Sequence, residues 1–92
     1  MAHTIRDKKK LRNRVRRIRG QIDAVEKALE HEQDCSTILL TIAACRGAIN
    51  GLMAVIIEGH IRYHLVDPDR QPTSEKAKAA QELIEVVKAY LR

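Results

Sequence analysis

Hydrophobic residues recur along this chain at a spacing that predicts two long helices. A first series of apolar side chains steps by 4, 3, 4, 3 and 4 residues: Leu11, Val15, Ile18, Ile22, Val25 and Leu29. A second series repeats the same steps: Ile38, Ile42, Cys45, Ile49, Leu52 and Ile56. Steps of 4 and 3 align side chains along one stripe of an α-helix, as at the a and d positions of a heptad repeat. The pattern therefore predicts an all-α fold.

The boundaries of these helices follow from local sequence. The first helix should end near residues 30–33, and Asp34 is a suitable N-cap for the second. The second helix should run to about Val66, because residues 67–72 contain two prolines that cannot continue it. A third helix is expected to start near residues 73–74. Its inward positions are predicted to be Ala80, Leu83, Val87 and Tyr90.

The connection between the first two helices is short, so they should pair as an antiparallel hairpin. The centre of that hairpin, near residue 32 or 33, places His3 opposite residues 61–62 and so beside His60 and His64 of the same chain. Thr4 followed by Asp7 is a candidate capping pair for the first helix. We expect a single domain, residues 1–92, built as a three-helix protomer.

The composition indicates that one protomer buries little apolar surface. The chain has 92 residues with no Trp and no Phe, so its core must be thin, and a metal or oligomerisation should help to stabilise it. The charged start does not resemble a signal peptide, and no uninterrupted apolar run approaches the roughly 18 residues of a membrane span. Two cysteines without a secretory segment favour a reducing compartment. We therefore expect a cytoplasmic protein without a membrane partner.

Charge is concentrated at the start of the chain. Residues 1–20 carry a net charge of +8, whereas residues 21–92 carry −3. Such a dense, Arg-rich block favours a nucleic-acid surface over a merely solvated helix face. No helix-turn-helix pattern accompanies it, so contacts to DNA phosphates are expected. The candidate DNA-binding residues are Lys10, Arg14, Arg16, Arg17 and Arg19 on the first helix, with Arg46 on the second.

Cysteine and histidine residues form a candidate metal site. His60 and His64 are four residues apart on one helical face, although alone they would fit a simple polar strip. Cys35 precedes His60 by 25 residues, and a continuous helix would hold the two roughly 37 Å apart. A second chain must therefore supply Cys35 to a shared ion. Together with His3, the candidate ligands suit Ni(II), Co(II), Zn(II) or Cu(II).

The placement of glycines supports the same dimer. If Cys35 of one chain meets His60 of another, two antiparallel copies of the second helix must cross near residues 47–48. Gly47 and Gly51 lie there, and each costs a helix up to about 1 kcal/mol relative to alanine. A close crossing between helices explains that cost. Cys45 belongs to the apolar stripe and is expected in the core.

Taken together, these residues resemble the CsoR/RcnR family of small helical repressors along essentially the whole chain. The resemblance is carried by residues 14–22 (RVRRIRGQI), Cys35, residues 42–53 (IAACRGAINGLM) and His60. It implies a dimer of dimers, that is, a homotetramer, with sensor sites that bridge protomers. It also implies an apo-protein that binds double-stranded operator DNA and an effector that releases it.

The ligand types distinguish branches within that resemblance. The start of the chain and the set His3, Cys35, His60 and His64 look like the nickel- and cobalt-sensing branch, which implies Ni(II) or Co(II) as effector and efflux as the regulated process. Formaldehyde sensors are similar through Cys35 and residues 14–20, so trapping of formaldehyde by Cys35 and the N-terminal amine stays open as an alternative. An enzyme is not expected, because only Glu58 stands near the ligands as a candidate base.

Overall fold

The computed structural model describes residues 3–91, with His3 described through its backbone only. It consists of α1 (His3–Arg6), α2 (Lys8–Glu30), α3 (Cys35–His60), a π-helical turn η1 (Ile61–Leu65) and α4 (Glu75–Tyr90). Within the described residues there is no strand, so the predicted all-α protomer of three main helices is confirmed.

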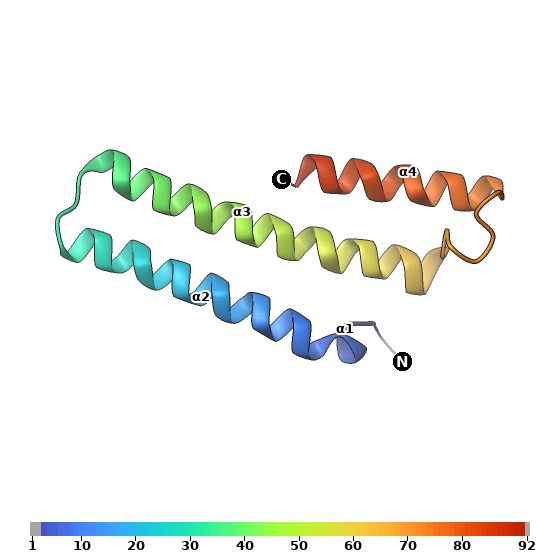
Figure 1. Ribbon diagram of the computed structural model, residues 1–92, viewed down its shortest axis with the longest axis horizontal. Coiled ribbons are helices and arrows are strands. Elements are labelled where there is room, and N and C mark those ends of the chain that lie inside the picture. Colours follow the sequence, from blue (N-terminus) through green and yellow to red (C-terminus); the bar gives the residue numbers. More distant parts are fainter. Residues whose placement is uncertain (1–2, 92) are drawn as a thin grey trace.

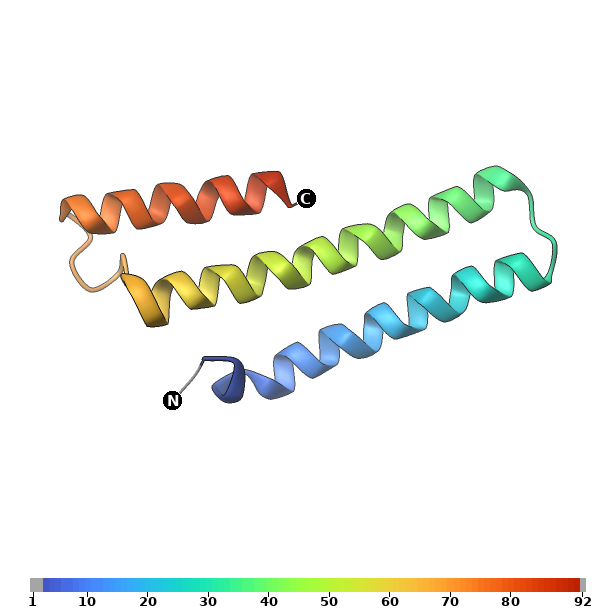
Figure 2. The same cartoon turned by 180° about the vertical axis from the view of Figure 1, so that it is seen from behind.

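The three main helices lie side by side, with α3 in the middle and α2 and α4 on either side of it (Figures 1 and 2). The principal extents are 55 × 25 × 12 Å. Because a helix with its side chains is about 10–12 Å across, the thickness of 12 Å is that of one helix. The protomer is therefore a single layer of helices, and no element of the described residues 3–91 covers either face of that layer.

The predicted antiparallel hairpin of α2 and α3 is confirmed, and its turn is held by a hydrogen-bonded helix cap. The N–H of Glu32 donates to the carbonyl oxygen of Leu29 at 3.1 Å, and the N–H of Gln33 donates to that of Ala28 at 3.0 Å. This pair of bonds is a Schellman motif, which requires a left-handed residue. Glu32 fills that position with φ of 52°.

Side-chain caps fix the starts of α3 and α4 where the sequence predicts them. Asp34 Oδ1 accepts the N–H of Thr37 at 3.2 Å, which begins α3 at Cys35. Ser74 Oγ accepts the N–H of Ala77 at 3.0 Å, which begins α4 at Glu75. Each cap satisfies an N–H group that the first helical turn leaves without an intrahelical partner.

Two helix ends differ from the prediction. The expected capping pair of Thr4 and Asp7 does not form: Thr4 lies inside the short α1, and Asp7 stands before α2 without a side-chain cap. The second helix reaches the expected end near Val66, but its last turn widens into η1. There the N–H of Val66 donates to the carbonyl oxygen of Ile61, five residues earlier, at 2.8 Å.

The face of α4 that packs inward is not the predicted one. Leu83 and Tyr90 were expected inside, yet Leu83 is 48% exposed and Tyr90 87% exposed, whereas Ile84 is completely buried. Ala77, Ala80 and Ile84 form the buried stripe instead. Ala80 and Ile84 meet Ile61 in the small core between α4 and η1. The prediction of Ala80 was right. The buried stripe continues through Ile84 instead of Leu83, because Ile84 faces α3 and η1, on which α4 packs.

Much of the predicted heptad stripe remains exposed in one protomer. Ile18 and Cys45 are buried, which confirms Cys45 as a core residue. Other stripe positions on α2 and α3 are open to solvent: Val15, Ile22, Leu29, Ile42 and Ile49. A helix pair in a single layer buries only the line where the two helices touch, so the flanks of each stripe stay uncovered.

The segment Cys35–Leu65 is long and apolar enough to cross a membrane, judged by length and composition alone. The sequence expectation considered only uninterrupted apolar runs and so overlooked this segment, which has a high mean hydropathy although polar residues are scattered along it. Only 11% of its most apolar stretch is buried inside the protomer. A core helix of a larger helical assembly has the same composition, since it is apolar on several sides.

Candidate functional site

His60 and His64 form a pair at the end of α3. His60 is the last residue of α3 and His64 lies in η1. Their ring centroids are 5.1 Å apart, with the ring planes inclined by 36°. Both residues are exposed at the protein surface. The structure therefore brings these two predicted ligands together within one chain.

The separation of the two rings suits a shared ion. Two imidazoles that bind one ion through bonds of about 2.0–2.1 Å have ring centroids roughly 4.5–5 Å apart. The observed 5.1 Å is close to that range. Imidazole is a common ligand of Zn(II), Ni(II), Co(II) and Cu(II). The spacing of the pair is therefore compatible with two ligands of one such ion, and an ion bound there would need further donors.

The two histidines lie at the π-helical turn that ends the second long helix. A π-helical turn inside an α-helix is uncommon and often lies at a functional site. Here the turn begins directly after His60 and contains His64. It also ends the helix, since Val66 has extended backbone angles.

Cys35 lies at the opposite end of the same helix. It is exposed and is the first residue of α3, next to the Asp34 cap. Hydrogen bonds from Thr37, and then from Ser36, lower the pKa of Asp34 below its ordinary value. Among the described residues no group of three or more potential ligands comes together. One protomer therefore does not join Cys35 to the histidine pair, as the spacing predicts.

The short helix α1 reaches the histidine end of α3. α1 begins at His3 and packs against α3, as the hairpin geometry predicts. The guanidinium carbon of Arg6 lies 3.8 Å from the ring centroid of Tyr63, which stands beside His64 on η1. The side chain of His3 lies outside the described part of the structure, so its role as a ligand stays a prediction.

A cluster of charged side chains fastens η1 to the segments that follow it. Arg62 donates through Nε to Glu58 Oε1 at 3.2 Å and through Nη1 to Asp69 Oδ2 at 3.0 Å. Asp67 Oδ1 lies 3.9 Å from the same Nη1. Lys88 of α4 contacts Glu58 Oε2 at 3.3 Å. The side chain of Arg62 is only 21% exposed, so this cluster helps to hold the linker and α4 against the histidine end.

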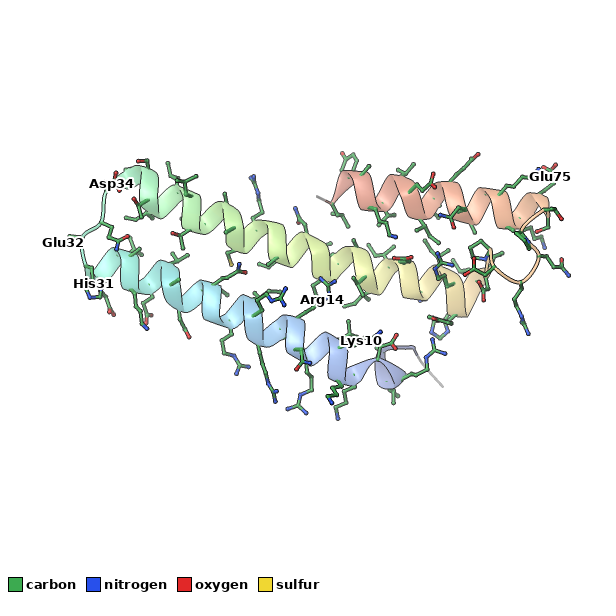
Figure 3. The ribbon with its side chains drawn as sticks, viewed as in Figure 1. Lys10, Arg14, His31, Glu32, Asp34 and Glu75 are labelled. Carbon is green, nitrogen blue, oxygen red and sulfur yellow. The ribbon has the colours of Figure 1, made fainter. Side chains whose placement is uncertain are left out.

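The predicted DNA-binding residues all lie on exposed positions, and α2 carries most of them: Lys10, Arg14, Arg16, Arg17 and Arg19, with Arg46 on α3. They do not form one surface. Figure 3 shows Lys10 and Arg14 directed toward α3. A Cβ atom built on Gly51 of α3 would lie 3.5 Å from Nη1 of Arg14. The side chain of Arg14 therefore reaches from α2 to α3.

A second basic surface lies elsewhere on α2, and the sequence prediction missed most of it. Lys8, Lys9, Arg12, Asn13 and Arg16 line a shallow hollow of about 390 Å³. Only Arg16 belongs to the predicted set. Residues 8, 12 and 16 are spaced four apart, which was the available signal that they share one helical face. A concave surface with four cationic side chains is suited to phosphate groups.

A flat all-α protomer with an exposed basic helix, and with candidate metal ligands that one chain does not bring together, fits a ligand-sensing DNA-binding regulator. Comparison with known proteins places the chain more closely. Residues 7–89 match a family described as "Metal-sensitive transcriptional repressor". The chain belongs to this family, also called CsoR/RcnR, and the predicted resemblance is confirmed. It is a transcriptional repressor by family and not an enzyme.

Two relatives match over the full length of both chains. The chain is 49% identical to an uncharacterized protein in the bioA 5' region of Serratia marcescens. It is 40% identical to the transcriptional repressor RcnR of Salmonella paratyphi B (strain ATCC BAA-1250 / SPB7). A solved structure of a glutamate-to-histidine variant of the formaldehyde-responsive regulator FrmR, from Salmonella enterica serovar Typhimurium, is 44% identical. It covers 92% of this chain and 94% of its own, with a TM-score of 0.63.

Proposed function

We propose that this repressor is cytoplasmic, that it binds operator DNA in its apo form, and that Ni(II) or Co(II) releases it, with Zn(II) as a further candidate effector. The observation that carries the proposal is the exposed pair of imidazoles at 5.1 Å, which fits two ligands of one such ion. The regulated process on this proposal is metal efflux.

The proposed site joins two protomers. His60 and His64, with His3 as a further ligand, come from one chain, and Cys35 comes from its partner. The thiol of Cys35 is exposed in the first turn of α3, so it is accessible to an ion held by a partner chain. In the proposed site the thiolate of Cys35 and the imidazoles would bind one ion. The positive charge of that ion would attract the donor atoms of both chains.

An assembly of four chains would cover the exposed faces. Each protomer is one helix thick, and its exposed apolar side chains include Leu39, Leu40 and Val86. Two antiparallel copies of α3 that cross near Gly47 would cover part of this surface. Apart from neighbouring atoms of its own helix, no described atom lies within 4 Å of a Cβ atom built on Gly47, so the protomer itself does not cover α3 at this position. The same arrangement accounts for the apolar character of α3 without a membrane.

The basic residues of α2 would hold the DNA backbone, and the sensor site would alter their placement. Contacts from lysine and arginine to phosphate give affinity that falls steeply with salt. α1 links the histidine end of α3 to the start of α2, so ordering of α1 at a bound ion would shift Lys8, Arg12 and Arg16. The resulting coupling is reciprocal: DNA must weaken metal binding by the factor by which metal weakens DNA binding.

The direct test is fluorescence anisotropy of the full-length protein on candidate promoter DNA, titrated separately with Ni(II), Co(II), Zn(II), Cu(I) and formaldehyde. Saturating Ni(II) or Co(II) should weaken DNA binding by roughly 5- to 150-fold, the usual range of allosteric coupling. Cys35→Ala and His64→Ala should remove this response. His31→Ala is the matched control, because His31 lies in the hairpin turn at the other end of the protomer. Unchanged DNA affinity at saturating metal would contradict the proposal.

Formaldehyde is the alternative effector, and the exposure of Cys35 favours it as well. The thiol and an amine would each add to one formaldehyde carbon, which forms a methylene bridge between sulfur and nitrogen and releases one water molecule. Mass spectrometry after treatment should then show a gain of one carbon atom at Cys35. An unmodified Cys35 with DNA still bound would exclude this alternative.

A further inference from the structure

The contact between Arg6 and Tyr63 joins the first helical turn of the chain to the histidine end of α3. The guanidinium carbon of Arg6 lies 3.8 Å from the ring centroid of Tyr63, well inside the roughly 6 Å over which a cation is attracted to an aromatic face. Both side chains are about half exposed. The contact is therefore a surface cation–π interaction that ties α1 to η1.

α1 needs such a tie because it cannot hold itself in place. It has four residues and is separated from α2 by Asp7, whose side chain makes no capping hydrogen bond to α2. Isolated helical turns of this length are unstable in water. Ile5, the apolar side chain of this turn, is 63% exposed and so anchors it weakly. The packing of α1 on α3 must therefore draw on specific contacts, and the contact of Arg6 with Tyr63 links α1 to η1.

Tyr63 is placed where such a tie affects the sensor site. It lies on η1 between Arg62 and His64, and three residues after His60. Holding Arg6 above this ring keeps the turn that starts at His3 within reach of the histidine pair. If α1 is already held beside the histidine pair, it loses less conformational entropy when an ion binds there. The ion is therefore bound more tightly.

We propose that Arg6 and Tyr63 are positioning residues: their cation–π contact latches α1 onto η1 and so preorganises the start of the chain beside His60 and His64. The proposal rests on the proposed function, because it assigns to the latch a role in effector binding. An exposed cation–π contact of about 0.5–1 kcal/mol corresponds to a two- to five-fold change in affinity.

The latch itself is tested in the metal-free full-length protein by NMR. The δ-protons of Arg6 should be shifted upfield by the Tyr63 ring, and the shift should disappear in Tyr63→Leu and persist in Tyr63→Phe. Circular dichroism would verify that both variants keep their helices, as expected for a residue that is 50% exposed. A wild-type Arg6 signal at its random-coil position would overturn the latch.

The role of the latch is tested by chelator competition with Ni(II) and Co(II). Tyr63→Leu and Arg6→Gln should each weaken metal binding two- to five-fold, whereas Tyr63→Phe should bind as the wild type does and Arg6→Lys should recover part of the loss. Equal metal affinity in all four variants would overturn the positioning role while the proposed function stands. A wild-type protein that binds neither ion would overturn the proposed function, and the Arg6 resonances would still decide whether the latch exists.

Discussion

Cys35 and His60 are the first and last residues of one uninterrupted α-helix. A rigid helix of 26 residues keeps its two ends apart whatever else the protein does. If both residues bind one ion, the ion must lie between two antiparallel copies of α3, and each dimer must contain two equivalent sites. This relationship makes subunit mixing a decisive experiment.

We expect Cys35→Ala and His64→Ala to complement each other when they are unfolded and refolded together. A mixed dimer has one intact site, whereas its other site lacks both ligands. Random pairing should therefore restore about a quarter of the wild-type number of metal sites, as follows from a two-fold symmetric interface. Equilibrium dialysis measures the stoichiometry. Each variant refolded alone is the control, and a mixture with no recovered site would show that Cys35 and His64 do not share an ion.

The hollow lined by Lys8, Arg12 and Arg16 predicts a change in the salt dependence of DNA binding. Arg16→Ala should weaken DNA binding and reduce the slope of log K against log [salt] by about 0.9, the value for one lost phosphate contact. Lys78→Ala on α4 is the matched control and should leave the slope unchanged. Anisotropy titrations at several salt concentrations provide the measurement. Identical slopes for Arg16→Ala and wild type would exclude this hollow from the DNA interface.

Two exposed helical glycines should respond differently to alanine. Apart from neighbouring atoms of the same helix, no described atom lies within 4 Å of a Cβ atom built on Gly20 or on Gly47, so one protomer tolerates both changes. Gly20→Ala should stabilise the protein by about 0.8–1.0 kcal/mol through helix propensity. Gly47→Ala should instead weaken dimerisation, because the added methyl groups separate the two crossing helices. Sedimentation equilibrium and urea unfolding distinguish these effects, and a more stable Gly47→Ala dimer would argue against the crossing at this residue.

Glu32 in the hairpin turn has a left-handed backbone conformation, which glycine adopts at a lower cost in free energy. Glu32 has φ of 52°, and the left-handed region costs residues with a Cβ atom roughly 1–2 kcal/mol. Glu32→Gly should therefore raise the free energy of unfolding by about 1 kcal/mol, measured by urea denaturation. Glu32→Ala removes the same charge but keeps the Cβ atom, so it should not stabilise the protein. Equal effects of the two changes would attribute the gain to charge instead.

The Asp34 cap should make the stability of the apo-protein depend on pH. Hydrogen bonds from Thr37 and Ser36 lower the pKa of Asp34 below the ordinary value of 3.8. Its contribution is therefore present above 3.8 and is lost as the pH falls through the lower pKa of the folded state. Asp34→Asn keeps an oxygen acceptor but has no charge to lose, so this part of the pH dependence should vanish. Thermal unfolding at several pH values, in the presence of a chelator, would measure the pH dependence of stability in both proteins.

Local sequence determined the helices of this protein and the separation of its candidate ligands. The heptad stripes of Leu11 to Leu29 and Ile38 to Ile56 set two long helices, and Asp34 and Ser74 fixed where the second and third begin, because caps act through hydrogen bonds within a few residues. The distance between Cys35 and His60 followed from the rise of a helix alone. The charge of residues 1–20 likewise indicated a polyanion surface without any structure.

Only the tertiary structure decided how these helices meet. Ile84, and neither Leu83 nor Tyr90, fills the core, because α4 can bury only the line along which it touches α3 and η1. Arg14 turns toward Gly51 while Arg16 joins Lys8 and Arg12, since residues two apart on a helix point in different directions. The contact of Arg6 with Tyr63 joins residues 57 positions apart in sequence. Such contacts depend on the packing of separate segments, which a local pattern of polar and apolar residues does not encode.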